Sequence, residues 1–426
     1  MKKILLILMA LPFLSFGQGK KILLLNGYLH VGNGQTIETA LVGIENGIIT
    51  QVGNSLATKI DKKYWDTIIE LNGQHIYPGF VAPNSTLGLT EIDAVRATRD
   101  YNDVGTFNPH VRSQIAYNVE SRVIETVRTN GVLITQATPR GGAISGTSSV
   151  MYLNGWNWED ATLSKDDGIH VNWPASIEGG GWWAEPAPKK RSENYDKEKQ
   201  ELIQFFDMAQ AYASNKKPVF DQRLEAMKNC FQKGANFRVY FHANELQQIL
   251  DIIDFSAKYG LRAVIVGGYD AHLAGKRLRD SNIPVMLQRL HSLPEHEEDA
   301  VDLPFKLPFL LQKEGIKFCL QNEGDMEAMN TRNIPFLAGT AMAYGLTEEE
   351  AVRAVSLSAC EILGIDKKYG SVEVGKSATL FVSKGSALDM RTNEINLILS
   401  NGKFIAVRNF QSELYLKYKT KYEQGN

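Results

Sequence analysis

Apolar runs that alternate with amphipathic segments constrain the fold of this chain more than any other feature. Between residues 79 and 364, short apolar runs are separated by stretches in which apolar and charged residues recur at helical spacing. Strands that alternate with helices in this way form βα units on a parallel sheet. We therefore predict strands at residues 79–83, 132–138, 237–244, 263–267, 284–288 and 317–321.

The segments between these strands carry helical signals. The clearest predicted helix spans residues 348–363, where Thr347 and Glu350 form a capping box and Gly364 ends the helix. Further helices are predicted after Asn194, Gln222, Glu245, Asp270 and Pro308.

Both ends of the chain have β-character instead. Between residues 20 and 77, short β-type runs are separated by Asn-Gly pairs, the strongest short-range hairpin signal. The region from 370 to 407 returns to this pattern, with a turn at Asn401-Gly402. We predict one β-domain built from residues 18–78 and 365–411, with residues 79–364 inserted between its halves. A surface helix is expected within the tail, residues 412–426.

The first 17 residues have the pattern of a secretory signal peptide. Lys2 and Lys3 precede an apolar run at residues 4–14, and the small residues Ser15 and Gly17 follow. This run is shorter than the roughly 20 apolar residues that a membrane-spanning helix needs. We expect export to the periplasm or the medium, without a membrane anchor.

Charge and cysteine content argue against two classes of protein. The formal net charge is −2 and no long cluster of Lys and Arg is present, so a nucleic-acid partner is not expected. The three cysteines have no paired spacing, so we expect small buried residues and no disulfide framework. These residues are Cys230, Cys319 and Cys360.

A tryptophan-rich segment at residues 155–190 shows neither strand nor helix periodicity. Long segments of this kind are usually functional or disordered, and aromatic density argues against disorder. We predict either a lid over a ligand or a partner surface. The segment holds five of the six tryptophans, Trp156, Trp158, Trp173, Trp182 and Trp183.

Three further segments carry a family resemblance. The first is Ile-Tyr-Pro-Gly-Phe-Val at 76–81, and the second is the strand at 131–135 with the glycine-rich loop at 139–146. The third is the pair of segments at 359–364 and 369–378, at the transition from helix to the last β-runs. In this order and spacing, they resemble the amidohydrolase superfamily, especially its imidazolonepropionase-like branch.

The resemblance implies both a fold and a chemistry. The fold is a (β/α)8 TIM-like barrel inserted into a small β-sandwich domain formed by both chain ends. One or two divalent metals, usually zinc, would lie at the strand ends, where a metal lowers the pKa of bound water to about 7 and polarises the scissile carbonyl. The implied substrates are small amides, lactams, cyclic imides or dipeptides.

The metal-binding residues of that superfamily are mostly replaced. Asn84 and Thr86 stand where the first strand would carry two histidines, and their groups bind zinc more weakly than imidazole does. His242 stands at an expected metal-ligand position and is the predicted metal residue, with His272 as a weaker candidate. The cofactor is accordingly either one zinc or other divalent metal ion, or none.

The remaining candidate residues follow from the same comparison. Glu323, with Asp325 as the alternative, would accept a proton after the last strand. Backbone amides of the glycine-rich loop would hold an anionic or carbonyl group. The predicted substrate-binding residues are Asn84, Thr86, Gly141, Gly142 and Ser145.

Two functions remain open from the sequence. The first is hydrolysis of a carbon–nitrogen bond in a small substrate at a reduced metal site. The second is a catalytically inactive barrel that binds a ligand, forms a homo-oligomer or joins a complete paralogue as a partner subunit. A third alternative is a mononuclear metal site that uses Glu91, Asp93 or His110 as an additional ligand.

Overall fold

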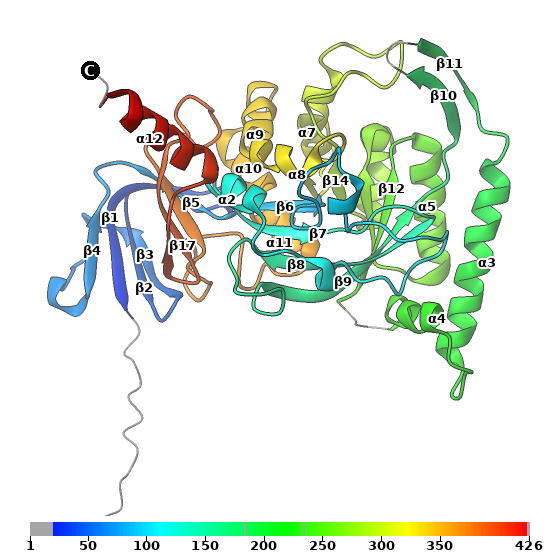
Figure 1. Cartoon of the computed structure of the whole chain (residues 1–426), viewed down its shortest axis with the longest axis horizontal. Coiled ribbons are helices and arrows are strands. Elements are labelled where there is room, and N and C mark those ends of the chain that lie inside the picture. The colour runs from blue at the N-terminus through cyan, green and yellow to red at the C-terminus, as the bar shows by residue number, and fades with distance from the viewer. Residues whose placement is uncertain (1–19, 183–184, 233, 235, 424–426) are drawn as a thin grey trace, which may run out of the picture.

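An α/β barrel and a β-domain make up the computed structural model, which describes residues 20–182, 185–232, 234 and 236–423 (Figure 1). The β-domain lies beside one end of the barrel, at the left of Figure 1, and helices surround the opposite side. The predicted signal peptide, residues 1–17, lies outside the described residues. Among the residues that are described, no helix is both long enough and apolar enough to cross a membrane.

One sheet of the β-domain takes its strands from both ends of the chain. These strands are β1 (Lys21–His30), β2 (Thr36–Glu45), β3 (Ile48–Asn54), β4 (Thr67–Glu70), β5 (His75–Pro78), β16 (Leu380–Ser383), β17 (Ile395–Ser400) and β18 (Lys403–Ile405). Their order is β18-β17-β16-β5-β1-β2-β3, and β4 pairs with β1. The antiparallel pair of β5 and β16 joins the two halves. Asn46 and Gly47, with φ of 52° and 82°, form the turn between β2 and β3, as their sequence predicts.

Eight strands form the barrel sheet. They are β6 (Phe80–Ser85), β7 (Val132–Ala137), β8 (Ile144–Tyr152), β9 (Thr162–Asn172), β12 (Arg238–Ala243), β13 (Ala263–Gly267), β14 (Val285–Leu287) and β15 (Phe318–Leu320). They are hydrogen-bonded in this order. The pair β6 and β7 is parallel, and so is the series from β9 to β15. The predicted α/β barrel is confirmed, and each of the six predicted strands is present.

The strands β8 and β9 were not predicted from the sequence. β8 runs antiparallel to both β7 and β9, so the chain passes between these strands without a covering helix. The glycines before β8 suggested a loop, whereas Ile144, Thr147 and Val150 are β-branched and all of β8 is buried. Burial on both faces removes the alternating pattern that marks a half-exposed strand.

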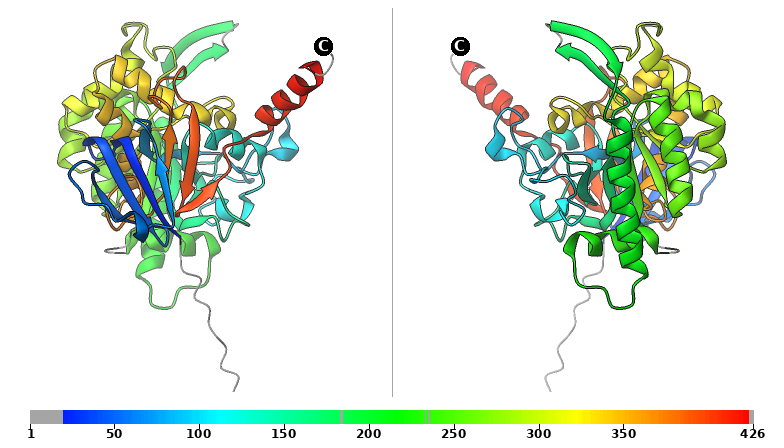
Figure 2. Two further views of the ribbon diagram at one scale, coloured as in Figure 1. Left: turned by 90° about the vertical axis from the view of Figure 1, so that its left-hand side faces the viewer. Right: turned by 90° about the vertical axis from the view of Figure 1, so that its right-hand side faces the viewer.

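The described residues form α-helices, most of which cover the outer face of the barrel. They are α1 (Ser113–Ala116), α2 (Arg122–Arg128), α3 (Tyr195–Ser214), α4 (Gln222–Met227), α5 (Leu246–Tyr259), α6 (Gly275–Asp280), α7 (Leu303–Lys313), α8 (Glu327–Asn330), α9 (Ile334–Ala343), α10 (Glu348–Ala354), α11 (Leu357–Leu363) and α12 (Phe410–Glu423). Short 3-10 helices are η1 (Lys62–Tyr64), η2 (Arg96–Thr98), η3 (Lys228–Phe231), η4 (Tyr269–Ala274) and η5 (Thr331–Asn333). The C-terminal helix α12 has no buried residue and projects from the molecule (Figure 2).

The predicted helix at 348–363 is two helices, α10 and α11. The carbonyl of Val355 accepts a hydrogen bond from the backbone N–H of Val81 in β6 at 2.8 Å, so it is used by the barrel. The Ser356 hydroxyl donates to the Val352 carbonyl at 2.7 Å and occupies a second helical acceptor. The predicted ends are confirmed, because the capping box is formed at the start of α10 and Gly364 is left-handed after α11.

The tryptophan-rich segment contains β9 and a hairpin of β10 (Ile177–Trp182) and β11 (Glu185–Arg191). The hairpin extends beyond the barrel (Figures 1 and 2). Trp173 is buried and its indole N–H donates to the Tyr195 hydroxyl at 3.1 Å, whereas Trp156 is 92% exposed. Trp183 lies outside the described residues, and the role of the segment as a lid or partner surface stays a prediction.

Apolar side chains inside the barrel include Val264, Val266 and Met286. Phe80, Val239 and Ile265 belong to the larger cluster that the strands form with the surrounding helices. All three cysteines are buried and unbridged, as the sequence indicates: Cys230, Cys319 and Cys360.

Candidate functional site

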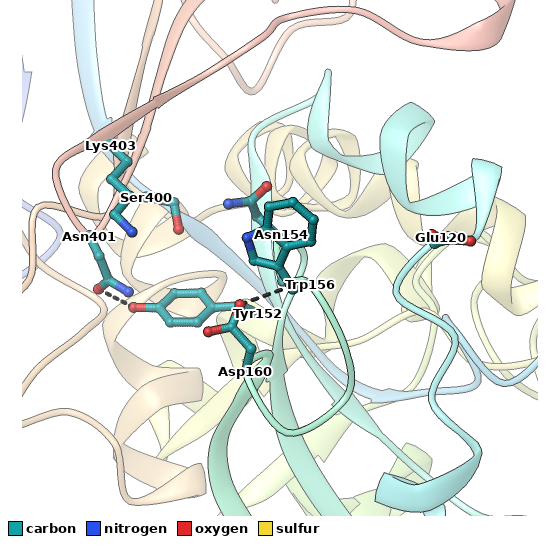
Figure 3. A pocket seen from close by; sticks show the side chains of 9 residues that line it. Glu120, Tyr152, Asn154, Trp156, Asp160, Ser400, Asn401 and Lys403 are labelled. Carbon is teal, nitrogen blue, oxygen red and sulfur yellow. Dashed lines mark hydrogen bonds between the residues drawn. The ribbon is translucent and has the colours of Figure 1, made fainter.

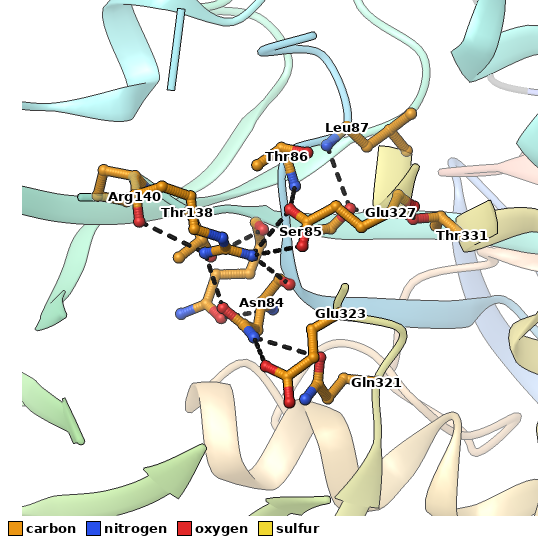
Figure 4. A network of polar contacts seen from close by, with 12 residues as sticks. Asn84, Ser85, Thr86, Leu87, Thr138, Arg140, Gln321, Glu323, Glu327 and Thr331 are labelled. Atoms are coloured by element: carbon orange, nitrogen blue, oxygen red, sulfur yellow. Dashed lines mark hydrogen bonds and ion pairs between the residues drawn. The ribbon is translucent and has the colours of Figure 1, made fainter. Parts of the chain in front are cut away.

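Asn84 lies at the centre of a polar cluster at the carboxyl end of β6 (Figure 4). It is fully buried and has a φ of 49°, a left-handed conformation that Asn adopts more readily than most residues. Its backbone N–H donates to the Gln136 side-chain oxygen at 3.0 Å. Its side-chain amide donates to Gln321 Oε1 at 3.2 Å and to Glu323 Oε2 at 3.1 Å. The residue therefore connects β6 to β7 and to the segment after β15.

The Arg140 guanidinium holds the other side of Asn84. One nitrogen donates to Asn84 Oδ1 at 2.9 Å, and the other donates to the Asn84 backbone carbonyl at 3.0 Å. The second nitrogen also donates to both carboxylate oxygens of Glu327, at 2.9 and 3.1 Å. The two side chains are only 22% and 10% exposed, so solvent screens this ion pair weakly.

Glu323 is the predicted catalytic carboxylate that reaches this cluster. Burial raises the pKa of its carboxyl group, and the neighbouring Gln321 side chain and the charge of Arg140 oppose that rise. A carboxyl group with a raised pKa is suited to carry a proton near neutral pH. Asp325, the predicted alternative, is exposed and lies at the mouth of the site.

His242 points to a second histidine inside the barrel. Its Nε2 lies 2.9 Å from Nδ1 of His170, which is at the end of the neighbouring strand β9. Burial and the charge of Arg140 lower the pKa of His242 to about 3. Burial, His242 and Arg140 lower the pKa of His170 as well. Both rings are therefore neutral at physiological pH, and the N–H of one ring donates a hydrogen bond to the bare nitrogen of the other.

The weaker candidate His272 lies elsewhere. Its Nδ1 is 3.2 Å from the carbonyl oxygen of Tyr269 within η4, which is a contact inside its own helical turn. Within the described part of the chain, it has no hydrogen bond to His242.

The buried carboxylate of Asp167 positions Gln136, the residue that accepts a hydrogen bond from the Asn84 backbone. Asp167 accepts hydrogen bonds from Gln136 Nε2 at 2.9 Å, from the Ser148 hydroxyl at 2.9 Å and from the Tyr240 hydroxyl at 2.5 Å. Burial raises the pKa of Asp167, while these hydrogen bonds oppose the rise. Because Gln136 also accepts from the Asn84 backbone, Asp167 holds the site from beneath.

The predicted substrate-binding residues separate into two places. Thr86 lies in the cluster: its backbone N–H donates to Glu327 at 3.0 Å, and its buried hydroxyl has no partner among the described residues. Gly142 and Ser145 are instead joined by Asn172, whose amide donates to the Gly142 carbonyl at 2.7 Å and to the Ser145 hydroxyl at 3.1 Å. Gly141 is exposed at the turn beside them, with a φ of 86°.

A pocket of about 290 Å³ opens above the Arg140–Glu327 ion pair. Its charged lining contains two guanidinium groups and three carboxylates. Burial and the neighbouring charge of Glu327 raise the pKa of one of them, Asp93. We call this cavity the strand-end pocket, and it is lined by Thr86, Asp93, Arg99, Tyr101, Arg140, Gly324, Asp325, Met326 and Glu327.

Other cavities lie outside this cluster, and two of them adjoin residues discussed above. One, of about 430 Å³, is lined by Gly142, Asn172 and Trp173 together with residues of α3. The other, of about 360 Å³, contains Tyr152, Asn401 and Lys403 at the junction of barrel and β-domain (Figure 3). Tyr152 pairs with Ile134 near the start of β7, so the junction cavity lies at the end of the barrel opposite to the strand-end pocket.

The additional ligands considered from the sequence do not gather around His242. Glu91 accepts hydrogen bonds from Asn118 and Ser121 at 3.0 Å each, and Asp93 lines the strand-end pocket. His110 has a buried Nδ1 without a partner among the described residues.

The donor set at the strand ends does not fit a divalent metal. Asn84 Oδ1 already accepts a hydrogen bond from the Arg140 guanidinium. Glu323 would have to be a metal ligand, but its carboxylate already accepts a hydrogen bond from Asn84 Nδ2. His242 and His170 are the two imidazoles present. Over the described ranges of the chain, no three or more His, Cys, Asp or Glu side chains are grouped so as to hold a metal ion. We therefore assign no chemical step to a metal.

Arg140, Glu327, His170 and Asp167 were not identified from the sequence as site residues. Arg140 had a usable signal, since it is a charged residue in a glycine-rich loop directly after a barrel strand, where barrel sites lie. Glu327 follows Glu323 and Asp325 in an acidic series after the last strand. The other two residues lie in β9, which was itself not predicted.

A barrel closed by a β-domain, with a polar cluster at the carboxyl ends of its strands, defines an α/β-barrel protein with a strand-end site. The chain belongs to the amidohydrolase family, whose model matches residues 177–407, more than half of the sequence. The imidazolonepropionase-like branch stays a prediction. No curated protein matches the chain.

Solved structures support the same fold. An amidohydrolase from Thermotoga maritima MSB8 is similar, with a TM-score of 0.73, 24% identity, and coverage of 91% of this chain and 100% of that chain. A prolidase complexed with N-methylphosphonate-L-proline has a TM-score of 0.53 at 16% identity, covering 91% and 99%. The ochratoxinase of A. niger has a TM-score of 0.52 at 14% identity, covering 91% and 96%. At these identities the similarity shows the fold alone.

Proposed function

We propose that this chain hydrolyses a carbon–nitrogen bond of a small substrate at the floor of the strand-end pocket, between Arg140, which lines the pocket, and Glu323, which directly precedes the lining residue Gly324. The observation that carries the proposal is that Asn84 joins Glu323 to Arg140: its amide donates to the Glu323 carboxylate, whose pKa is raised by burial, and its oxygen accepts from the partly buried guanidinium. An acid–base group next to a fixed positive charge is the arrangement that amide hydrolysis uses.

The two groups have separate roles in this proposal. Water adds to the carbonyl carbon, and the Glu323 carboxylate accepts its proton. The Arg140 guanidinium stabilises the negative charge that develops on the carbonyl oxygen. The carbon–nitrogen bond then breaks, the proton passes from Glu323 to the leaving nitrogen, and a carboxylic acid and an amine are formed.

The charges of the strand-end pocket support a small polar substrate. Arg99 and Arg140 can pair with a carboxylate, while Asp93 and Asp325 can pair with an ammonium group. The volume of about 290 Å³ limits the substrate to a small molecule. The names prolidase and Xaa-Pro dipeptidase, given to two proteins of similar fold, guide the substrates to be tried first.

A second function, ligand binding without hydrolysis, is supported by one specific observation. Both sides of the Asn84 amide and the Arg140 guanidinium are already bonded within the protein, so the cluster is stable without substrate. In this alternative, the barrel binds a ligand or serves as a subunit beside a second copy or a complete paralogue. We further propose, from the leader-like first 17 residues, that the protein is exported.

Mass spectrometry of the products formed from a panel of dipeptides, N-acyl amino acids, lactams and cyclic imides tests the first function, because each hydrolysis adds one water and forms a carboxylic acid with an amine or, for an imide, an amide. The variant Glu323→Gln keeps the size of the side chain and removes the acid–base group, so it should lose at least about 100-fold in kcat while it still binds substrate. Glu91→Gln is the control, because that carboxylate bonds Asn118 and Ser121 and does not line the pocket, so the variant should retain activity. A loss in Asp325→Asn instead would transfer the proton-carrying role to Asp325. Saturable binding with no turnover of any compound would support the second function.

A further inference from the structure

The position of Asn84 is where the structure departs most from its family. The resemblance of the first barrel strand places a metal-binding histidine there, and this chain places an amide. The amide oxygen is not vacant, because the Arg140 guanidinium donates to it at 2.9 Å. A positively charged group of the protein thus lies within hydrogen-bond distance of the side chain that replaces the metal ligand.

Arg140 is held in this place by several independent contacts. It bonds the backbone carbonyl of Asn84 at 3.0 Å, and the same nitrogen donates to both carboxylate oxygens of Glu327. Glu327 is fixed in turn, since it accepts from the backbone N–H of Thr86, and its own carbonyl accepts from the Thr331 hydroxyl at 2.8 Å. The two terminal nitrogens of the planar guanidinium bond Asn84 in a bidentate way, at its side-chain oxygen and its backbone carbonyl, and a lysine ammonium does not offer this geometry.

We propose that Arg140 is a built-in cation that takes the place of the divalent metal in this barrel, and that it binds the carbonyl or carboxylate oxygen of a ligand. The guanidinium lines the strand-end pocket and is 22% exposed, so part of it faces the cavity while the rest is bonded to Asn84 and Glu327. The inference concerns the cation of the site, and it holds whether the site hydrolyses its ligand or only binds it.

The electrostatics around Arg140 support this assignment. A divalent ion beside Asn84 would lie next to the guanidinium, and like charges at such short range in a partly buried site repel each other strongly. The anionic residue that would attract a metal, Glu327, is neutralised by the arginine. The positive charge of Arg140 also favours the neutral forms of His170 and His242, which lie close enough to feel it.

Zinc content and thermal unfolding test the proposal without any need for activity. The purified full chain is incubated with excess zinc chloride, desalted and analysed for bound zinc by mass spectrometry. Less than about a tenth of an equivalent of zinc is expected, with an unchanged Tm. Arg140→Ala should lower Tm by at least roughly 5 °C, because it leaves Glu327 as an unpaired carboxylate. Added methylguanidinium chloride should restore part of that loss.

Arg112→Ala is the matched control, because it removes an ion pair of similar length, Arg112 to Asp166 at 2.8 Å, from a more exposed place. It should lower Tm less, and methylguanidinium should have no effect on it. Arg140→Lys keeps the charge without the bidentate geometry, so its Tm should lie between those of wild type and Arg140→Ala. This variant provides a readout if the alanine variant does not fold.

Two results would overturn the proposal. One is close to one equivalent of zinc in the wild-type protein that is lost in His242→Ala, since the site would then hold a metal beside the arginine. The other is an Arg140→Ala variant that matches the Arg112→Ala control in Tm and does not respond to methylguanidinium. A failure to find any hydrolysed substrate changes neither measurement, so it bears on the proposed function alone.

Discussion

Asp167 offers the sharpest test of how the site is supported. Three donors converge on its carboxylate, from Gln136, Ser148 and Tyr240. Hydrogen bonds to a charged acceptor contribute about 1.5 to 3 kcal/mol each. The gross contribution of the three is therefore large, but the carboxylate is 2% exposed and its burial acts in the opposite direction.

The cost of Asp167→Ala depends on which donors find new partners. Gln136 Nε2 already lies 3.1 Å from the Ser148 hydroxyl, and Ser148 can donate to the Gly168 carbonyl at 3.3 Å. The Tyr240 hydroxyl has no other partner in the described structure and stays unsatisfied, which costs about 1 to 3 kcal/mol. With the cavity left by the side chain, we expect the free energy of unfolding to fall by about 2 to 4 kcal/mol.

Asp167→Asn should cost much less, about 1 kcal/mol. The asparagine oxygen can accept from Gln136 and Tyr240, where Asp167 Oδ2 accepts now, and its amide can donate to Ser148. Asp166→Asn is the control: that neighbouring carboxylate is 27% exposed and pairs only with Arg112, so a change below about 1 kcal/mol is expected.

Urea unfolding at pH 7, followed by circular dichroism, measures these differences. The reasoning is refuted if Asp167→Ala lies within about 0.5 kcal/mol of wild type, or if Asp167→Asn destabilises as much as Asp167→Ala. Either result would show that the three donors do not depend on this carboxylate.

Three further predictions use the same unfolding assay. The folded-state pKa of His242, about 3, is below the unfolded value of 6.5, so the unfolded chain binds more protons between these values and the free energy of unfolding must rise with pH across that range. When the pH falls from 7.5 to 5, the free energy of unfolding should drop by roughly 2 kcal/mol more in wild type than in His242→Gln. Equal drops in the two proteins would contradict the lowered pKa of His242. Gly131→Ala should destabilise by at least about 2 kcal/mol, because φ is 90° and a Cβ would meet the Phe381 ring at 2.5 Å, and an unchanged midpoint would refute this packing. Thr347→Ala removes the hydroxyl that accepts from the Glu350 backbone N–H at 3.3 Å and should cost about 1 kcal/mol, whereas Thr347→Ser should cost almost nothing.

The barrel and the β-domain were predictable because they depend on local patterns. Apolar runs such as residues 263–267 are strands in the structure because the whole run is buried, and Asn46-Gly47 forms its turn because both residues tolerate positive φ. The break between α10 and α11 was not predictable. It depends on Val81, a strand residue far away in the sequence that takes the Val355 carbonyl.

The candidate site was predictable only in part, for a related reason. Asn84 and Glu323 follow predicted strands, and strand ends of a barrel converge, so their proximity could be expected. Arg140 is 56 residues from Asn84 and 187 residues from Glu327, and its role arises from how the glycine-rich loop returns over the barrel. The same loop carries Gly142 and Ser145 away to the Asn172 side, where sequence reasoning had not placed them.

By itself, the sequence determined the α/β architecture, the β-character of both chain ends and the presence of Asn and Thr at positions 84 and 86, because these depend on residue type and spacing. Only the tertiary structure decided which group replaces the missing ligands. An isolated arginine is a solvated cation in any sequence, and it becomes part of a site when Asn84 and Glu327 are brought within hydrogen-bond distance and most of its surface is withdrawn from water.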